Sequence, residues 1–271
     1  MTFFNKQPPP LAIGGVGGSG TRVVATVLSQ LGYFMGSDLN EPMDNLLFTL
    51  LFKRAELWPP EEHQAEINKA CDIFLKASLT QKAWRESETA YLRSLCQNNR
   101  PLHSREWLEA RVERLLDRTN SDYQHGKWGW KEPNTHILLP ALLKAWPQMR
   151  YIHVVRHGLD MAYSSNQNQL QLWGRQLLDT QVISIDADTS FQYWCAAHRR
   201  IAQIGKTMDS RFLMLNFDKL CQQPEKELEV LFNFLEIETS PEVKKHLASL
   251  VHQPTSLGRY RNQALSDIKP S

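Results

Sequence analysis

The chain has 271 residues, of which 42% are hydrophobic and 22% charged, a composition that excludes a disordered chain and suits a globular domain with a sizeable core. Its 31 Lys and Arg residues nearly balance its 29 Asp and Glu residues, giving a net charge of +2. We therefore expect no chain-wide basic surface for nucleic acid, although this balance leaves room for a local basic pocket that binds a phosphate.

The start of the sequence and its cysteines favour a cytoplasmic protein. No apolar run reaches the length of about 18 residues that a membrane-spanning helix needs, so no transmembrane segment is expected. The first residues, MTFFNKQPPP, lack the apolar stretch of a signal peptide. We expect free thiols in a reducing compartment, with neither disulfides nor a metal site, because no Cys-x-x-Cys pair occurs among Cys71, Cys96, Cys195 and Cys221.

The first predicted elements are a short buried strand and an amphipathic helix. The apolar run 11–16 ends in glycines, which is typical of a buried strand. From Thr21 onward apolar residues recur at helical spacing as far as Gly32, a common residue at helix ends. Residues 33–35 are a candidate for a second, brief strand. The stretch 41–124 predicts a helical insertion, with amphipathic helices around 61–79, 81–98 and 104–118.

Strand-like segments resume after the insertion and alternate with helical ones. Strands are predicted over 127–131, 150–155 and 212–217, and helices over 134–146, 157–166, 190–208, 225–235 and 241–251. This alternation indicates an α/β fold, a central parallel sheet with helices on both faces. We expect a single domain over 1–271 that contains the insertion 41–124 and ends in a C-terminal loop or tail, 252–271.

A glycine-rich loop, GGVGGSGTR, joins the first strand to the first helix at 14–22. Backbone N–H groups at a helix N-terminus bind anions, and glycines let a phosphate approach closely. The loop is not a Walker A motif, because Thr21-Arg22 stands where that motif has Lys followed by Ser or Thr. The alternative interpretation is a plain strand–helix turn that happens to be rich in glycine.

An arginine and a serine stand eight residues apart after the strand predicted at 150–155. Arg156 lies at the carboxyl end of that strand, where ligands of α/β sheets bind, and Ser164 follows about two helical turns later. A guanidinium offers two parallel donors to a phosphate, and a hydroxyl adds a third. The alternative is that Arg156 pairs with Asp160 and that Ser164 is solvated.

Together, the glycine loop and the Arg-x7-Ser pair resemble the sulfotransferase family that uses 3′-phosphoadenylyl sulfate (PAPS). Further matches follow in the family's order: GWKEP at 129–133, ILLPALLKAWPQMRYIHVVRHGLDMAYS at 137–164, RFLMLNFDKLCQQPEKELEVLFNFLEI at 211–237 and GRYR at 258–261. The resemblance covers 11–40 and 127–261, and the insertion carries none of it. Each motif is weak alone, whereas the ordered set is specific.

The resemblance implies a P-loop NTPase-like fold and a donor site at the glycine loop. In the family, this loop holds the 5′-phosphosulfate, the Arg and Ser hold the 3′-phosphate, and a basic C-terminal loop closes over it. One residue departs from the pattern: Gly18 stands where the family usually has Lys or Arg. The implied donor-binding residues in this chain are Gly17, Gly18, Ser19, Gly20, Thr21, Arg22, Arg156, Ser164, Arg259, Tyr260 and Arg261.

The resemblance also implies two catalytic residues, a cation and a base. It places Lys131 beside the transferring sulfuryl group, and the alternative is a surface lysine paired with Glu132. Many relatives keep a catalytic His two residues after this Lys, where this chain has Pro133. Some relatives use a Glu shortly after the first helix, and Glu41 is accordingly the predicted base. The alternatives for this role are Asp38, Asp44 and His136.

The implied activity is transfer of a sulfuryl group from PAPS to a hydroxyl or amine, with PAP as the product and without a metal ion. The acceptor is expected to be a carbohydrate, a lipid headgroup or a small alcohol rather than nucleic acid. Two alternatives stay open. A non-catalytic member that binds PAPS or PAP is compatible with Gly18, and a P-loop kinase of small molecules is less favoured because the Walker lysine is absent.

Overall fold

The computed structural model describes residues 8–80, 82–97, 100–117, 126–263 and 268. A parallel sheet lies at its centre, with the strand order β2-β1-β3-β4. Its strands are β1 (Leu11–Gly15), β2 (Gly129–Lys131), β3 (Arg150–Val155) and β4 (Phe212–Asn216). Because neighbouring strands run parallel, their carboxyl ends meet at one edge of the sheet. The glycine-rich loop and Lys131 are therefore neighbours at that edge.

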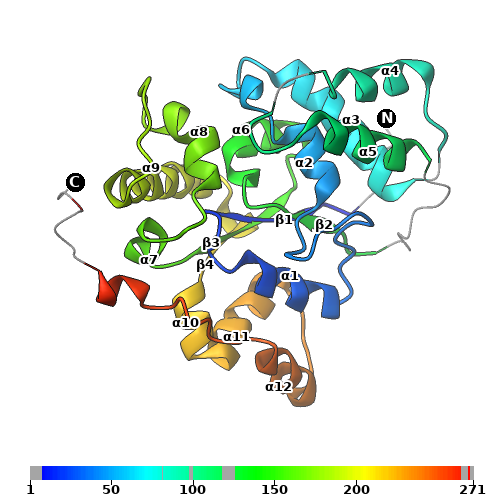
Figure 1. Ribbon diagram of the computed structural model, residues 1–271. Helices are drawn as coiled ribbons and strands as arrows, with labels where there is room; N and C mark the ends of the chain where they lie inside the picture. Colours follow the sequence, from blue (N-terminus) through cyan, green and yellow to red (C-terminus); the bar gives the residue numbers. More distant parts are fainter. Residues whose placement is uncertain (1–7, 81, 98–99, 118–125, 264–267, 269–271) are drawn as a thin grey trace.

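Helices lie on both faces of this sheet (Figure 1). One side carries α1 (Thr21–Gln30), α10 (Phe217–Gln222), α11 (Pro224–Leu235) and α12 (Pro241–Ser249). The other side carries α2 (Leu46–Phe52), α3 (Gln64–Leu79), α4 (Glu86–Ser94), α5 (Arg105–Leu116), α6 (Thr135–Ala145), α8 (Asn168–Leu177) and α9 (Ala187–Lys206). The short helix α7 (Gly158–Ala162) follows β3 and packs on α9. The predicted α/β fold with helices on both faces is thus confirmed.

Alternating side chains of the strands build a core on each side of the sheet. On β3, Ile152 and Val154 pack with apolar residues of α1 and α11, whereas Tyr151 packs with the aromatic residues of the opposite side. Trp128 and Trp130, in and next to β2, are at most 1% exposed and belong to that aromatic core. This packing fixes β2 against the aromatic core and places Lys131 at the carboxyl end of that strand.

Several predicted elements differ from the observed ones in extent. Residues 33–35 form no strand, since only an isolated bridge joins Phe34 to Trp128. The helix predicted over 157–166 ends at Ala162, so Ser164 lies beyond it. The C-terminal tail forms a 3-10 turn at Arg259–Asn262. The ends of the predicted insertion helices at 81, 98 and 118, and most of 264–271, lie outside the described residues.

Candidate active site

The glycine-rich loop brings backbone donors to the carboxyl edge of the sheet. Gly18 and Gly20 have φ angles of 90° and 91°, a left-handed conformation that favours glycine. A Cβ atom on Gly20 would lie 2.1 Å from the Phe217 ring, so space also excludes a side chain there. Within the described chain, no side chain caps the N-terminus of α1, and the buried Ser19 hydroxyl has no hydrogen-bond partner. This arrangement suits an anion.

Arg156 and Ser164 lie beside this loop. The Arg156 side chain is 4% exposed, and its Nη1 donates to the carbonyl oxygen of Gly18 at 3.4 Å. A Cβ atom on Gly18 would lie 3.9 Å from Ser164 Oγ, which shows how closely the serine borders the loop. The loop, the end of β3 and the segment after α7 therefore converge, although they are far apart in sequence.

Asp160 connects Arg156 to the C-terminal loop that carries Arg259 and Arg261. Its fully buried carboxylate accepts hydrogen bonds from Arg156 Nη2 at 3.1 Å, from the Gly258 N–H at 2.7 Å and from the Tyr260 N–H at 3.3 Å. Burial alone would raise the pKa of Asp160, but these hydrogen bonds and the charge of Arg156 lower it below its ordinary value. Asp160 is therefore a charged anchor for the loop.

The C-terminal loop also contacts the site directly. Arg156 Nη2 donates to the carbonyl oxygen of Ser256, and the Tyr260 ring stacks on His157 with centroids 4.5 Å apart. A cavity of about 260 Å³ opens between this loop, His157 and Asp218. The pairing of Arg156 with Asp160, which the sequence offered as the alternative to phosphate binding, is thus present, and the same guanidinium reaches both the glycine loop and the C-terminal loop.

Lys131 lies at the carboxyl end of β2 with its ammonium group buried among oxygen atoms. Its side chain is 2% exposed, and Nζ contacts the Asp44 carboxylate and donates to the carbonyl oxygen of Pro42 at 2.7 Å. The alternative of a surface lysine paired with Glu132 is wrong, because Glu132 faces Lys53 at 3.9 Å and accepts from Asn134. Lys131 and Asp44 thus form a charge pair next to the glycine loop.

The other candidates for the base lie in different surroundings. The Glu41 side chain is 92% exposed and pairs with Arg22 at 3.6 Å on the outside of α1. His136 is fully buried in α6, where burial lowers its pKa to about 3, so the ring is neutral at pH 7. Asp38 accepts from Arg111 at 2.9 Å. Of the four candidates, only Asp44 has a described contact with Lys131.

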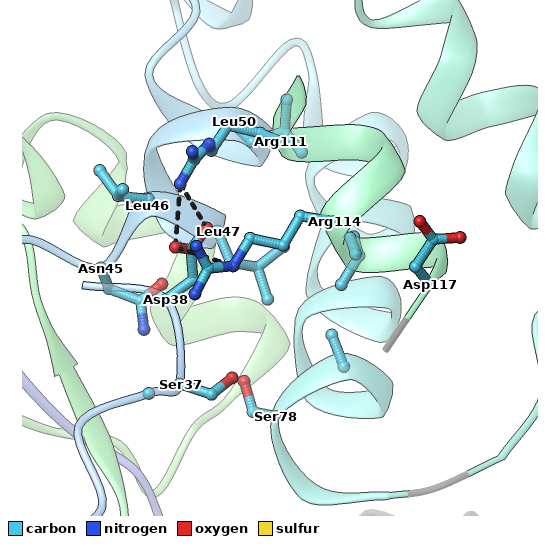
Figure 2. Close-up of a pocket in the computed structure, with 13 residues that line it drawn as sticks. Ser37, Asp38, Asn45, Leu46, Leu47, Leu50, Ser78, Arg111, Arg114 and Asp117 are labelled. Carbon is cyan, nitrogen blue, oxygen red and sulfur yellow. Dashed lines mark hydrogen bonds and ion pairs between the residues drawn. The ribbon is translucent and has the colours of Figure 1, made fainter. Parts of the chain in front are cut away.

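A larger pocket opens between the loop after α1 and helices α2, α3 and α5 (Figure 2). Its volume is about 570 Å³. Asn45 lines it, and the Asn45 N–H donates to the carbonyl oxygen of Lys131 at 2.8 Å. Asn45 follows Asp44 in the chain, so the pocket borders the segment that carries Asp44.

The model of a sulfotransferase family matches residues 9–241, which is most of the chain. This chain belongs to the sulfotransferase family. It is also similar to a "Putative protein-tyrosine sulfotransferase" from Caenorhabditis briggsae, with 22% identity over 116 residues. That match covers 43% of this chain and 39% of the relative, so it spans well under half of either protein.

Solved structures of sulfotransferases resemble the chain as well. The sulfotransferase domain of the Synechococcus PCC 7002 olefin synthase is 18% identical with a TM-score of 0.49, covering 96% of this chain and 90% of that domain. A sulfotransferase from Mycobacterium avium is 16% identical with a TM-score of 0.44, covering 89% of this chain and 67% of that one. No helix in the described part of this chain is both long and apolar enough to cross a membrane.

The sequence did not reveal the contacts of Asp160 with the C-terminal loop or the proximity of Asn166 to the glycine-rich loop. Asp160 was considered only as a partner of Arg156, yet it also holds the C-terminal loop. The Asn166 side chain lies 3.7 Å from the position of a Cβ atom on Gly17. The short spacing Arg-x3-Asp was the available signal for Asp160, whereas no local pattern marked Asn166.

Proposed function

We propose that this sulfotransferase transfers a sulfuryl group from PAPS to a hydroxyl or amine of an acceptor. The observation that carries the proposal is the convergence of the glycine loop, Arg156 and Lys131 at the carboxyl edge of the sheet. Three groups of hydrogen-bond donors support binding of an anionic nucleotide at this site. They are the N-terminus of α1, which no side chain caps, and the Ser19 hydroxyl and Arg156 Nε, which are buried without a hydrogen-bond partner among the described residues.

The proposed donor site has two halves. The loop from Gly17 to Arg22 receives the 5′-phosphosulfate, because its N–H groups point from a helix N-terminus. Arg156 and Ser164 receive the 3′-phosphate from the far side of Gly18, and Arg259, Tyr260 and Arg261 are near enough through the C-terminal loop to close over it. This assignment uses the bidentate geometry of a guanidinium.

The proposed chemistry centres on the Lys131–Asp44 pair. The acceptor oxygen or nitrogen forms a bond to sulfur, the bond from sulfur to the 5′-phosphate oxygen breaks, and Asp44 takes the acceptor proton. Lys131 stabilises the negative charge that shifts onto the leaving phosphate and sulfuryl oxygens. Asp44 is preferred to Glu41 because it contacts Lys131, whereas Glu41 is exposed and paired with Arg22. Positioning and electrostatics then supply most of the catalysis.

Because Gly18 replaces a Lys or Arg, the glycine loop lacks the cation that many relatives have there. The position that carries Lys or Arg in many relatives here has a φ of 90°, a conformation that costs a side chain about 1–2 kcal/mol. The Arg22 side chain is 57% exposed and pairs with Glu41. To contact a bound donor, Arg22 would have to break this surface ion pair. We infer that Lys131 and the loop N–H groups carry the charge stabilisation.

Calorimetry with PAP, AMP and ATP tests the donor site. We expect PAP to bind more tightly than AMP, because only PAP carries the 3′-phosphate that Arg156 would hold. Preference for ATP would support a kinase instead. Labelled PAPS, incubated with a library of hydroxyl and amine acceptors, then tests turnover. Binding of PAP without any consumption of PAPS would identify a non-catalytic member.

A further inference from the structure

The pocket of about 570 Å³ beside Asp44 has chemistry that narrows the acceptor. Its volume lies in the range of small-molecule sites, about 300–1,000 Å³. Asn45 lines the pocket, follows Asp44 in the chain and donates its N–H to the carbonyl oxygen of Lys131, so the pocket borders the segment that carries the proposed base. An acceptor held here would lie beside the segment that carries Asp44.

One wall of the pocket carries two arginines of α5, Arg111 and Arg114, which point toward Asp38 (Figure 2). Arg111 Nη1 donates to both oxygens of Asp38, at 2.9 and 3.1 Å. Arg114 Nε lies 3.5 Å from the same carboxylate. Two guanidinium groups thus share one carboxylate. Asp117, at the end of α5, points away from both of them (Figure 2).

The arginines keep donors that Asp38 does not use. Asp38 takes a single nitrogen, Nη1, of Arg111, and Arg111 Nε is buried without a hydrogen-bond partner in the described residues. The Trp107 ring, 5.7 Å from the Arg111 guanidinium carbon, keeps that side chain in place. An anionic oxygen is the natural partner for guanidinium donors that Asp38 leaves unused.

The remaining lining is apolar. Leu46, Leu47, Leu50 and Leu115 line the same pocket. Leucine side chains favour an acceptor with a hydrocarbon or aromatic body between its reactive group and its charged group. The arginine side and the leucine side thus define one ligand with three parts.

We propose that the acceptor is a small amphiphilic molecule with a hydroxyl or amine at one end, an apolar body, and an anionic group that Arg111 and Arg114 bind. This inference rests on the proposed function, because it takes Lys131 and Asp44 as the reaction centre. The inference specifies the charge and polarity of the acceptor, which the proposed donor site leaves open.

Direct binding of three matched phenols tests the proposal: 3-(4-hydroxyphenyl)propanoate, its neutral amide, and the cation tyramine. Calorimetry is done on the full chain saturated with PAP, so that the anion cannot occupy the donor site. We expect the propanoate to bind about tenfold or more tighter than the amide, and tyramine to bind weakest. Equal binding of the propanoate and the amide, or no binding of the propanoate at millimolar concentrations, would overturn the proposal.

Arginine variants show whether the preference comes from this pocket. Arg114→Gln and Arg111→Gln should each reduce the preference for the propanoate over the amide by about threefold or more while the affinity for PAP stays unchanged. Arg105→Gln is the matched control, since Arg105 is on α5 but pairs with Glu109 on the surface. Survival of the preference in both pocket variants would contradict the proposal. Failure of the wild type to bind PAP would instead contradict the proposed function.

Asp38→Asn gives an opposite expectation. Without its carboxylate the two arginines lose a competing anion, so the affinity for the propanoate should rise while that for the amide stays nearly constant. A purely structural ion pair between α5 and the loop after α1 predicts no such selective gain. Weaker binding of all three phenols would show that Asp38 acts only by holding the pocket together, and would count against anion recognition.

Discussion

At the scale of single residues, the site depends on which carboxylate faces Lys131. Asp44 contacts the buried ammonium group, whereas Glu41 lies on the surface with Arg22. A general base must reach the proton it removes, and its loss typically costs about 10²–10⁴-fold in rate. Geometry therefore favours Asp44, although the pattern of relatives favoured Glu41.

We predict that Asp44→Asn lowers turnover of PAPS by about 10²–10⁴-fold while PAP affinity changes little. Glu41→Gln is the matched comparison, because it removes a carboxylate from the same loop without touching Lys131. Initial rates with a fixed acceptor and calorimetric affinities for PAP provide the two measurements. If Glu41→Gln turned over PAPS slowly and Asp44→Asn turned it over at the normal rate, Glu41 rather than Asp44 would be the base.

Arg156 supports a second prediction at this scale. Arg156→Lys keeps the charge beside buried Asp160 but loses the planar fork that binds a phosphate in two places. We expect the affinity for PAP to fall by about tenfold or more and that for AMP to change far less. Calorimetric titrations with both nucleotides measure this difference. Equal weakening of PAP and AMP would place the 3′-phosphate elsewhere.

At the scale of elements, the C-terminal loop is attached to α7 through one carboxylate. Asp160 accepts from the N–H groups of Gly258 and Tyr260, and Arg156 contacts Ser256 in the same loop. Because the pKa of Asp160 is lowered, its contribution is present above the ordinary aspartate value of about 3.9 and is lost as pH falls through the lower folded value. The loop should therefore remain attached at neutral pH.

We predict that Asp160→Asn accelerates trypsin cleavage after Arg259 and Arg261, because the neutral amide accepts weaker hydrogen bonds from the loop. Mass spectrometry of timed digests identifies cleavage at these sites. Asp188→Asn, which changes a carboxylate on exposed α9 surface bonded to Gln192, is the control. PAP should slow the cleavage in the wild type if Arg259 and Arg261 close over the nucleotide. Identical digestion with and without PAP would contradict that closure.

At the scale of the whole molecule, three histidines form a buried cluster between β3, α6 and α9. The His153 ring lies 5.7 Å from His136 and 5.1 Å from His198, measured between centroids. Burial lowers the pKa of His136 to about 3 and that of His198 to about 4, and it lowers the pKa of His153 as well. Neutral rings are thus part of the folded core.

This cluster makes the fold sensitive to acid. In the unfolded chain each histidine has a pKa of about 6.5, so below that pH the unfolded state binds more protons and stability falls as pH falls toward the folded values. At pH 5 the penalty is about 2 kcal/mol for each of His136 and His198. Urea denaturation at pH 7 and pH 5 measures the loss.

A variant separates this cluster from other titrating groups. His198→Gln should reduce the difference in unfolding free energy between pH 7 and pH 5, whereas His246→Gln on the surface of α12 should leave it unchanged. Comparing these differences cancels the opposite contribution of Glu132, whose pKa is raised by burial. An equal pH dependence in the wild type and in His198→Gln would show that the histidines do not govern acid stability.

Much of the fold followed from local patterns. Short apolar runs predicted the strands, and apolar residues at helical spacing predicted the helices, because each element buries one face against the sheet. The glycine loop was also recognisable in the sequence. The positive φ angles at positions 18 and 20 favour glycine, so the conformation of the loop leaves its mark on the composition. Arg156 was predicted as a ligand-binding residue because it follows the strand β3, and ligands bind at the carboxyl ends of parallel strands.

By itself, the sequence determined the parallel α/β architecture, the place of the glycine loop and the membership in the sulfotransferase family. Only the tertiary structure decided which charges meet. Lys131 and Asp44 are 87 residues apart, and Asp160 and Gly258 are 98 apart. Spacing along the chain determines contacts within a helix or strand, but contacts between elements depend on how those elements pack. For that reason the partner of Lys131, the anchor of the C-terminal loop and the two arginines of the large pocket emerged from the fold alone.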